Sequence, residues 1–137
     1  LGVSFVAFSP VARGFLCGPL DVNAFDAKDI RRSMPRFAPD TYARNAALLP
    51  AYRALAAEAG CTPVQLAIAW LLHQGPDILP IPGTTRVEHL HDDLGAADVK
   101  LPADLLARLG ALINPQTVHG DRYNAQANSE VDTETFG

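Results

Sequence analysis

The chain has 137 residues, of which 48% are apolar and 19% are charged, and its mean hydropathy is +0.06. This composition is typical of a soluble globular domain, or of part of one, and excludes a disordered or fibrous chain. Eleven Lys and Arg against fifteen Asp and Glu give a formal net charge of −4, with the acidic residues scattered. Neither a nucleic acid nor an anionic membrane is therefore an expected partner.

The apolar runs and the cysteines further limit the classes of protein to which the chain can belong. The longest apolar runs, residues 3–8 and 64–72, are far shorter than the roughly 20 residues that span a bilayer. Cys17 and Cys61 lie far apart, without the spacing of a zinc site or a disulfide framework, and no secretory signal is recognisable. We expect a cytoplasmic protein with no metal site. The only methionine is Met34, so we also expect the sequence to be a fragment of a longer product.

The first predicted element is a strand over residues 3–8, followed by a long loop. This run is apolar at nearly every position, which is typical of a strand that is buried on both faces. Residues 11–39 contain glycines and prolines in irregular order and predict a loop without regular elements. Long loops in compact domains are usually functional or disordered.

Two helices are predicted next. Residues 40–60 have a helical composition that Pro50 must kink or divide and that Gly60 ends. Residues 62–65 form a capping-box pattern that opens a second helix, which we expect to run through Gln74. Apolar residues surround the axis of this second helix, so it is expected to be buried.

The remaining elements are a strand, two helices and a tail. Residues 78–81 predict a short apolar strand, and residues 85–88 predict another capping box. The helix that follows carries one apolar stripe, and residues 102–113 predict the last helix. The apolar stripe of the helix after residues 85–88 consists of Val87, Leu90, Leu94 and Ala97. The polar residues 116–137 are expected to form a tail that docks on another surface.

This order of elements predicts an α/β fold with parallel strands. Two strands cannot cover both faces of a parallel sheet, which usually has about 4 to 6 strands. Either the chain pairs with a second copy or the remaining strands lie outside this sequence.

Each predicted strand is followed by a segment with the chemistry of an anion site. Residues 9–18 combine a serine hydroxyl, glycines that permit close backbone approach, and Arg13. Residues 83–86 enter a helix whose N-terminus attracts anions, with two threonine hydroxyls and Arg86 beside it. The alternatives are a glycine turn with a solvated arginine and a helix start that is capped without a ligand.

Several segments together resemble the carboxyl-terminal part of an aldo-keto reductase. The matching order and spacing covers residues 6–16, residues 35–37, Asn45, residues 60–72 and residues 81–94. Gly120–Tyr123 and Val131–Glu134 resemble the end of bacterial members of this family. The resemblance implies the last two strand–helix units of a (β/α)8 TIM barrel in residues 1–115, followed by a carboxyl-terminal tail in residues 116–137. Such barrels have about 250 residues or more, so the barrel is expected to be incomplete, with an amino-terminal portion missing.

The resemblance also implies the function and the cofactor site. Members reduce an aldehyde or ketone to an alcohol with NADP(H), so the expected partner is a small-molecule carbonyl substrate. Residues of the first segment would hold the pyrophosphate and nicotinamide side: Ser9, Pro10, Val11, Arg13, Gly14 and Leu16. Residues of the second segment would hold the adenosine 2′-phosphate: Gly83, Thr84, Thr85 and Arg86.

Three residues on the following helix depart from the family pattern. His89, Asp92 and Asp93 stand where the family often has a basic residue, a glutamate and an asparagine around the phosphate and adenine. A histidine is cationic only near or below pH ~6.5, and Asp93 replaces an amide by a charge. The preference for NADP over NAD is therefore open, and for His89 a solvated position is an equal alternative.

No catalytic residue is assigned to this chain. The family's proton-donating tyrosine, with its lysine, aspartate and histidine, belongs to earlier barrel units. His119, Asp121 and Tyr123 lie close in sequence, but that proximity is weak evidence for catalysis. The chain alone is expected to be inactive. The alternative function is a non-catalytic, truncated nucleotide-binding or structural remnant, and the sequence does not identify the carbonyl substrate.

Overall fold

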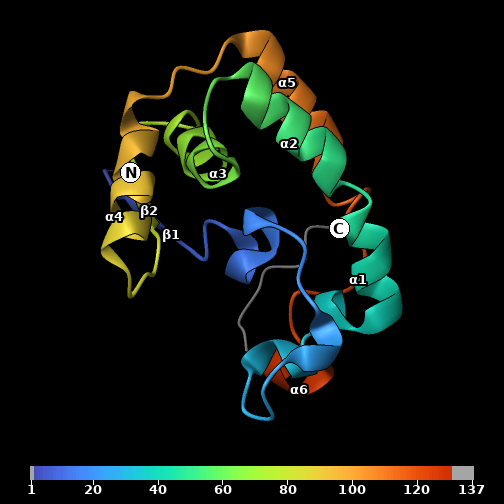
Figure 1. The fold of residues 1–137 in the computed structure, drawn as a ribbon. Coiled ribbons are helices and arrows are strands. Elements are labelled where there is room, and N and C mark those ends of the chain that lie inside the picture. The colour runs from blue at the N-terminus through green and yellow to red at the C-terminus, as the bar shows by residue number, and fades with distance from the viewer. Residues whose placement is uncertain (1, 131–137) are drawn as a thin grey trace. The chain divides into compact units, whose positions relative to one another are not determined.

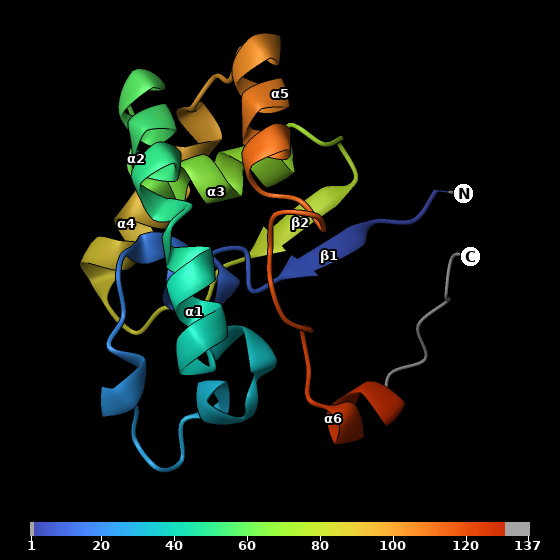
Figure 2. The same cartoon turned by 90° about the vertical axis from the view of Figure 1, so that its right-hand side faces the viewer.

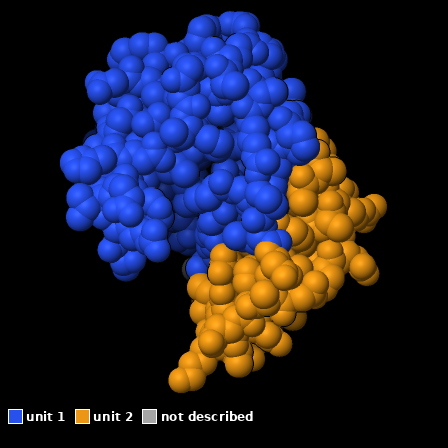
Figure 3. Space-filling view, in the orientation of Figure 1, with its two compact units in different colours: residues 1–20, 48–114 blue, residues 21–47, 115–137 orange. Residues whose placement is uncertain are grey.

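The computed structural model describes residues 2–130 of the chain, and Figure 1 shows their elements. Contacts divide these residues into two compact units. The first comprises residues 2–20 and 48–114, and the second comprises residues 21–47 and 115–130 (Figure 3). The Val131–Glu134 segment, which resembles the end of bacterial aldo-keto reductases, lies outside the described residues.

Two parallel strands form the sheet of the first unit. The strands β1 (Phe5–Phe8) and β2 (Ile78–Ile81) pair with Phe5 opposite Ile78 and Phe8 opposite Ile81. Their arrows point the same way in Figure 2. The prediction of two parallel strands is confirmed. Because the register aligns the last residues of both strands, the segments that follow them leave the sheet at the same edge, the one formed by the carboxyl ends of the strands.

The strands are not buried on both faces, contrary to the sequence prediction. Ala7 is buried, but Phe5, Val6 and Phe8 are 46–63% exposed. A sheet of two strands has two outer edges, and within the described residues no third strand pairs with either edge. The apolar composition of these strands therefore suits a larger sheet than the one that these residues form.

The proline in the first predicted helix divides it as expected. The chain forms α1 (Pro39–Ala46) and α2 (Leu49–Glu58), with Pro50 in the first turn of α2. Proline is tolerated there because the first amide groups of a helix have no intrahelical acceptor. Gly60 follows α2 with φ +67°, a left-handed conformation that glycine adopts at little cost.

The capping box predicted for the next helix is present. Thr62 Oγ1 accepts a hydrogen bond from the Gln65 amide at 3.0 Å, and Gln65 Oε1 accepts one from the Thr62 amide at 3.1 Å. The helix α3 (Pro63–Leu72) ends two residues before the predicted position. Leu66 is fully buried, but Leu72 is exposed, so the helix is not covered all round.

The core of the first unit lies where α2, α3 and α5 (Ala103–Leu112) meet. The core residues are Tyr52, Leu55, Ala56, Leu66, Ala69, Leu101, Leu105 and Leu109.

No single helix among residues 2–130 is long and apolar enough to cross a membrane. The helical segments 39–58 and 63–72 meet the length and composition criteria only when they are counted together as one bent pair.

The capping box predicted at residues 85–88 is wrong. The helix α4 (Val87–Gly95) begins one residue later than that pattern requires, and its N-cap, Arg86, makes no side-chain capping bond. Thr84 Oγ1 instead accepts from the Arg86 amide at 3.2 Å, so a hydroxyl-closed turn precedes the helix. The apolar stripe of α4 is exposed at Val87, Leu90 and Leu94, and a short 3-10 helix, η5 (Ala96–Asp98), follows.

The long loop contains more regular structure than its sequence predicts. Four short 3-10 helices lie within residues 11–39, the first in the first unit and the others in the second. The second unit also contains α1 and the five-residue helix α6 (Ala125–Ser129). The 3-10 helices are η1 (Ala12–Cys17), η2 (Val22–Ala24), η3 (Ile30–Ser33) and η4 (Pro35–Phe37).

The carboxyl-terminal segment docks on α1 through a buried amide. Asn45 Nδ2 donates to the His119 carbonyl at 3.0 Å, and Asn45 Oδ1 accepts from the His119 amide at 2.8 Å. Arg36 Nε also donates to the Gly120 carbonyl at 3.0 Å. These bonds fix the start of the tail on the second unit itself.

We predict that Asn45→Ala releases this segment. The substitution removes two hydrogen bonds and leaves the backbone of His119 unsatisfied, which costs about 1–3 kcal/mol of unfolding free energy. Urea denaturation measures that loss, and limited proteolysis should cut residues 115–130 faster. Asn23→Ala, at an exposed asparagine of the same unit, is the matched control. Equal proteolysis of the two variants would contradict the prediction.

Candidate functional site

The two segments singled out in the sequence converge at one edge of the sheet. Both follow the aligned carboxyl ends of β1 and β2. The pKa of the Cys17 thiol, at the end of the first segment, is raised by partial burial and then by the charges of Asp93 and Asp92 on α4. Cys17 therefore lies within electrostatic reach of α4, the helix that follows the second segment.

The segment after β1 has an unusual backbone. Ser9, Ala12 and Arg13 have φ values of +54°, +51° and +56°, and Gly14 has +88°. Non-glycine residues in such conformations cost about 1–3 kcal/mol each and persist only where the surrounding structure imposes them. Turn bonds fix this backbone, with the Ala12 amide donating to the Ser9 carbonyl at 2.9 Å.

The same segment borders a mostly apolar cavity of about 220 Å³. Ser9, Pro10 and Leu16 line it together with Tyr52 and Trp70. Burial raises the pKa of Tyr52, whose hydroxyl donates to the Pro63 carbonyl at 2.6 Å. The Tyr52 hydroxyl is thus held in its protonated form and donates to the backbone at the start of α3. The remaining predicted residues of this segment, Val11, Arg13 and Gly14, are half-buried.

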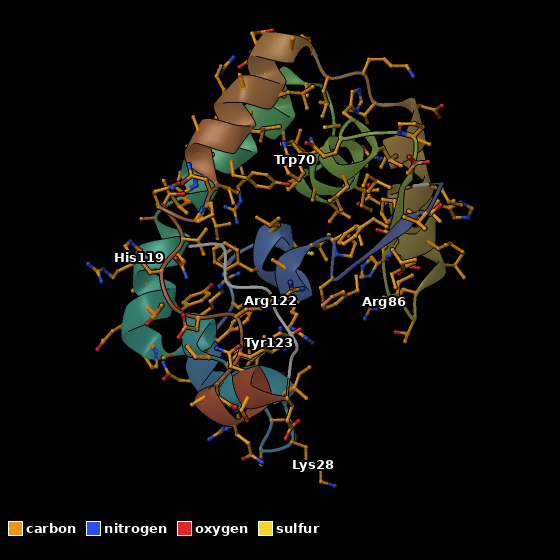
Figure 4. All side chains as sticks on the ribbon, turned by 180° about the vertical axis from the view of Figure 1, so that it is seen from behind. Lys28, Trp70, Arg86, His119, Arg122 and Tyr123 are labelled. Atoms are coloured by element: carbon orange, nitrogen blue, oxygen red, sulfur yellow. The ribbon has the colours of Figure 1, made fainter. Side chains whose placement is uncertain are left out.

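The segment after β2 is open to solvent. Gly83, Thr84, Thr85 and Arg86 are all exposed (Figure 4 labels Arg86). Arg86 Nη1 lies 3.8 Å from Glu88 Oε1, a long contact between exposed side chains that is worth little energy. Among the described residues no side chain caps the first turn of α4. An exposed guanidinium beside an uncapped helix N-terminus suits a phosphate group.

The three residues of α4 that depart from the family pattern differ in their surroundings. His89 is exposed, whereas Asp92 and Asp93 are half-buried. Thr62 Oγ1 lies 3.0 and 3.1 Å from the two carboxylate oxygens of Asp92 and donates to them. Burial and the charge of Asp92 raise the pKa of Asp93, and His89 opposes that shift. Asp92 therefore contacts the start of α3, and the charges of both aspartates reach Cys17.

Among the contacts described for the second unit, none joins His119, Asp121 and Tyr123 to one another. The bonds described for His119 go through its backbone to Asn45, and the Tyr123 ring lies 5.5 Å from the Arg122 guanidinium (Figure 4). Within residues 2–130, no three His, Cys, Asp or Glu side chains are grouped to hold a metal ion.

The sequence analysis missed two residues that organise these regions. It identified Thr62 as a helix cap but not as the partner of Asp92, which lies 30 residues away in sequence. It noted Asn45 only as part of a family pattern, because the mostly polar sequence of α1 gives no signal that this amide is buried.

Comparisons with known proteins agree with this geometry. A sequence profile of the aldo/keto reductase family matches residues 1–114. The chain is similar to the crystal structure of a thermostable aldo-keto reductase, Tm1743, in complex with the inhibitor epalrestat, at 28% identity and TM-score 0.52, over 82% of this chain and 30% of that one. It also resembles the glycerol dehydrogenase AKR11B4 from Gluconobacter oxydans, at 22% identity and TM-score 0.63, over 82% and 37%. The chain thus spans about a third of these structures.

We predict that both thiols react slowly and that Asp92 contributes to this. Burial, then nearby carboxylates, raise the pKa of Cys17 and Cys61, so each holds less thiolate at pH ~8 than a thiol of ordinary pKa, ~8.5. Iodoacetamide labelling followed by mass spectrometry should be slower in the folded chain than in urea. Asp92→Asn should accelerate labelling of both cysteines, whereas Asp104→Asn on α5 should not. Unchanged rates in Asp92→Asn would contradict the prediction.

Proposed function

The chain belongs to the aldo/keto reductase family, and from this premise we propose that it forms the cofactor-binding end of an NADP(H)-dependent oxidoreductase that reduces an aldehyde or ketone to an alcohol. The observation that carries the proposal is the register of β1 and β2. It delivers both predicted cofactor segments to one edge of the sheet. In α/β barrels that edge is where ligands bind.

The proposed architecture is the last two strand–helix units of a (β/α)8 barrel in residues 1–115, with residues 116–137 as a tail. The parallel pairing and the 30–37% coverage of the similar structures support it. Val6 lies opposite Leu79 and Phe8 opposite Ile81, so these four side chains form one apolar layer. They are 46–52% exposed.

The partner that we propose for this layer is an amino-terminal barrel portion. Additional strands at the outer edges of β1 and β2 would satisfy the unpaired strand groups and remove the apolar layer from water. The exposed stripe of α4 would be covered in the same way. These surfaces are apolar because the complete barrel buries them.

The proposed cofactor site divides between the two segments. The fixed backbone after β1, with Arg13, would bind the pyrophosphate, and Ser9, Pro10 and Leu16 would border the nicotinamide side. Arg86 and the first turn of α4 would bind the 2′-phosphate. Exposure and a weak contact with Glu88 leave the Arg86 guanidinium able to turn toward a phosphate. NADPH would supply the hydride, and the proton donor would come from the barrel portion outside this chain.

We predict that Arg86→Ala weakens NADPH binding selectively. A charge-assisted hydrogen bond is worth about 1.5–3 kcal/mol, so the Kd for NADPH should rise about ten- to a hundredfold, with a smaller change for NADH. Calorimetric titration of the purified chain measures both constants. Arg44→Ala, which removes an exposed arginine of α1, is the matched control. Equal losses for the two nucleotides would contradict the assignment of Arg86 to the 2′-phosphate.

We predict that the 137-residue chain does not catalyse carbonyl reduction. Incubation with NADPH and a panel of aldehydes and ketones should give no loss of NADPH absorbance above the protein-free rate. Turnover that disappears in Arg86→Ala would show that the chain contains its own proton donor. If NADPH binds without turnover, the chain is a cofactor-binding part. If NADPH does not bind, the structural-remnant alternative is favoured.

A further inference from the structure

The helix α4 lies on the surface of the first unit. It contains no buried residue, and Val87, Leu90 and Leu94 are exposed. The helix contacts α3 and η5. The apolar stripe of α4 is therefore largely exposed within the described residues, and a polar contact also joins α4 to the start of α3.

Those polar contacts centre on the N-terminus of α3. Thr62 Oγ1 accepts from the Gln65 amide and shares its one hydrogen between the two carboxylate oxygens of Asp92. One hydroxyl thus closes the cap of α3 and bonds α4 in the same chain of hydrogen bonds. The carboxylate also lies at the positive end of the ten-residue helix α3, where a negative charge is favoured.

A close approach near the end of α4 reinforces this contact. A Cβ built on Gly95 would lie 2.5 Å from Gln65 Nε2. Gln65 cannot swing away without cost, because its Oε1 accepts from the Thr62 amide. The carboxyl-terminal end of α4 therefore lies close against the same cap that binds Asp92.

We infer that Thr62 and Asp92 act as a positioning pair that holds the first turn of α4, with Arg86, in place for the cofactor phosphate. The inference rests on the proposed function. Asp92 then acts through the orientation of its helix, and its carboxylate is engaged by α3 instead of serving as a direct cofactor ligand. The groups facing it are Thr62 and the half-buried Asp93 beside it, with the thiols of Cys17 and Cys61 nearby.

The test replaces Thr62 by two residues that both cap helices. Aspartate and asparagine are as good at an N-cap as threonine, so the cap of α3 is kept. Thr62→Asp cannot donate to Asp92 and places a like charge against it, whereas Thr62→Asn can donate. Combining Thr62→Asp with Asp92→Asn exchanges donor and acceptor and restores the bond. Asp104→Asn is the control for loss of a carboxylate elsewhere.

Two measurements are made on the complete 137-residue chain and its variants: amide hydrogen exchange of α4 and calorimetric titration with NADPH and NADH. We expect Thr62→Asp to accelerate exchange in α4 and to weaken NADPH binding roughly threefold to thirtyfold. NADH binding should change less, because the 2′-phosphate contact depends most on Arg86. Thr62→Asn and the exchanged double variant should return both measurements toward those of the parent chain.

The outcomes separate this inference from the proposed function. If the parent chain does not bind NADPH, the proposed function is overturned and the inference falls with it. If the parent binds but Thr62→Asp leaves affinity or α4 exchange unchanged, only the inference is overturned. Equal losses for NADPH and NADH, or no rescue by the exchanged double variant, would mean that the pair stabilises the fold without positioning the phosphate site.

Discussion

The parallel pairing of β1 with β2 is the constraint on which the rest of the first unit depends. The register sets Phe8 opposite Ile81, and every group discussed as a cofactor contact lies downstream of one of these two residues. A shift by one residue would turn Ala7, the buried member of β1, to the opposite face. The same pairing therefore fixes both the core side of the sheet and the edge at which the two segments meet.

The two segments at that edge are built in different ways. The backbone after β1 is held in left-handed conformations by its own turn bonds, so its shape is largely set before any ligand arrives. The segment after β2 is exposed and begins a helix that the described residues leave uncapped by any side chain. One side of the proposed site is thus rigid backbone, and the other depends on how a lightly packed helix is anchored.

Local sequence signals predicted local structure well. Pro50, Gly60 and the Thr62 capping box all act within four residues, and the structure confirms each of them. The second predicted capping box does not form, because Thr84, one residue before the pattern, accepts the hydrogen bond from the Arg86 amide. The Thr62–Asp92 bond was beyond prediction, since it joins residues 30 positions apart. The expected burial of β1 is not observed. An apolar strand sequence indicates that the strand suits a larger sheet, but among the described residues β1 has one neighbouring strand.

The docking of the carboxyl-terminal segment has a consequence for sequence variation. The Asn45 side chain bonds the amide and the carbonyl of His119, and the imidazole takes no part in either bond. Position 119 can therefore accept many side chains while the segment keeps its place, whereas position 45 needs a group that both donates and accepts at that length. We therefore expect related chains to vary more at position 119 than at position 45.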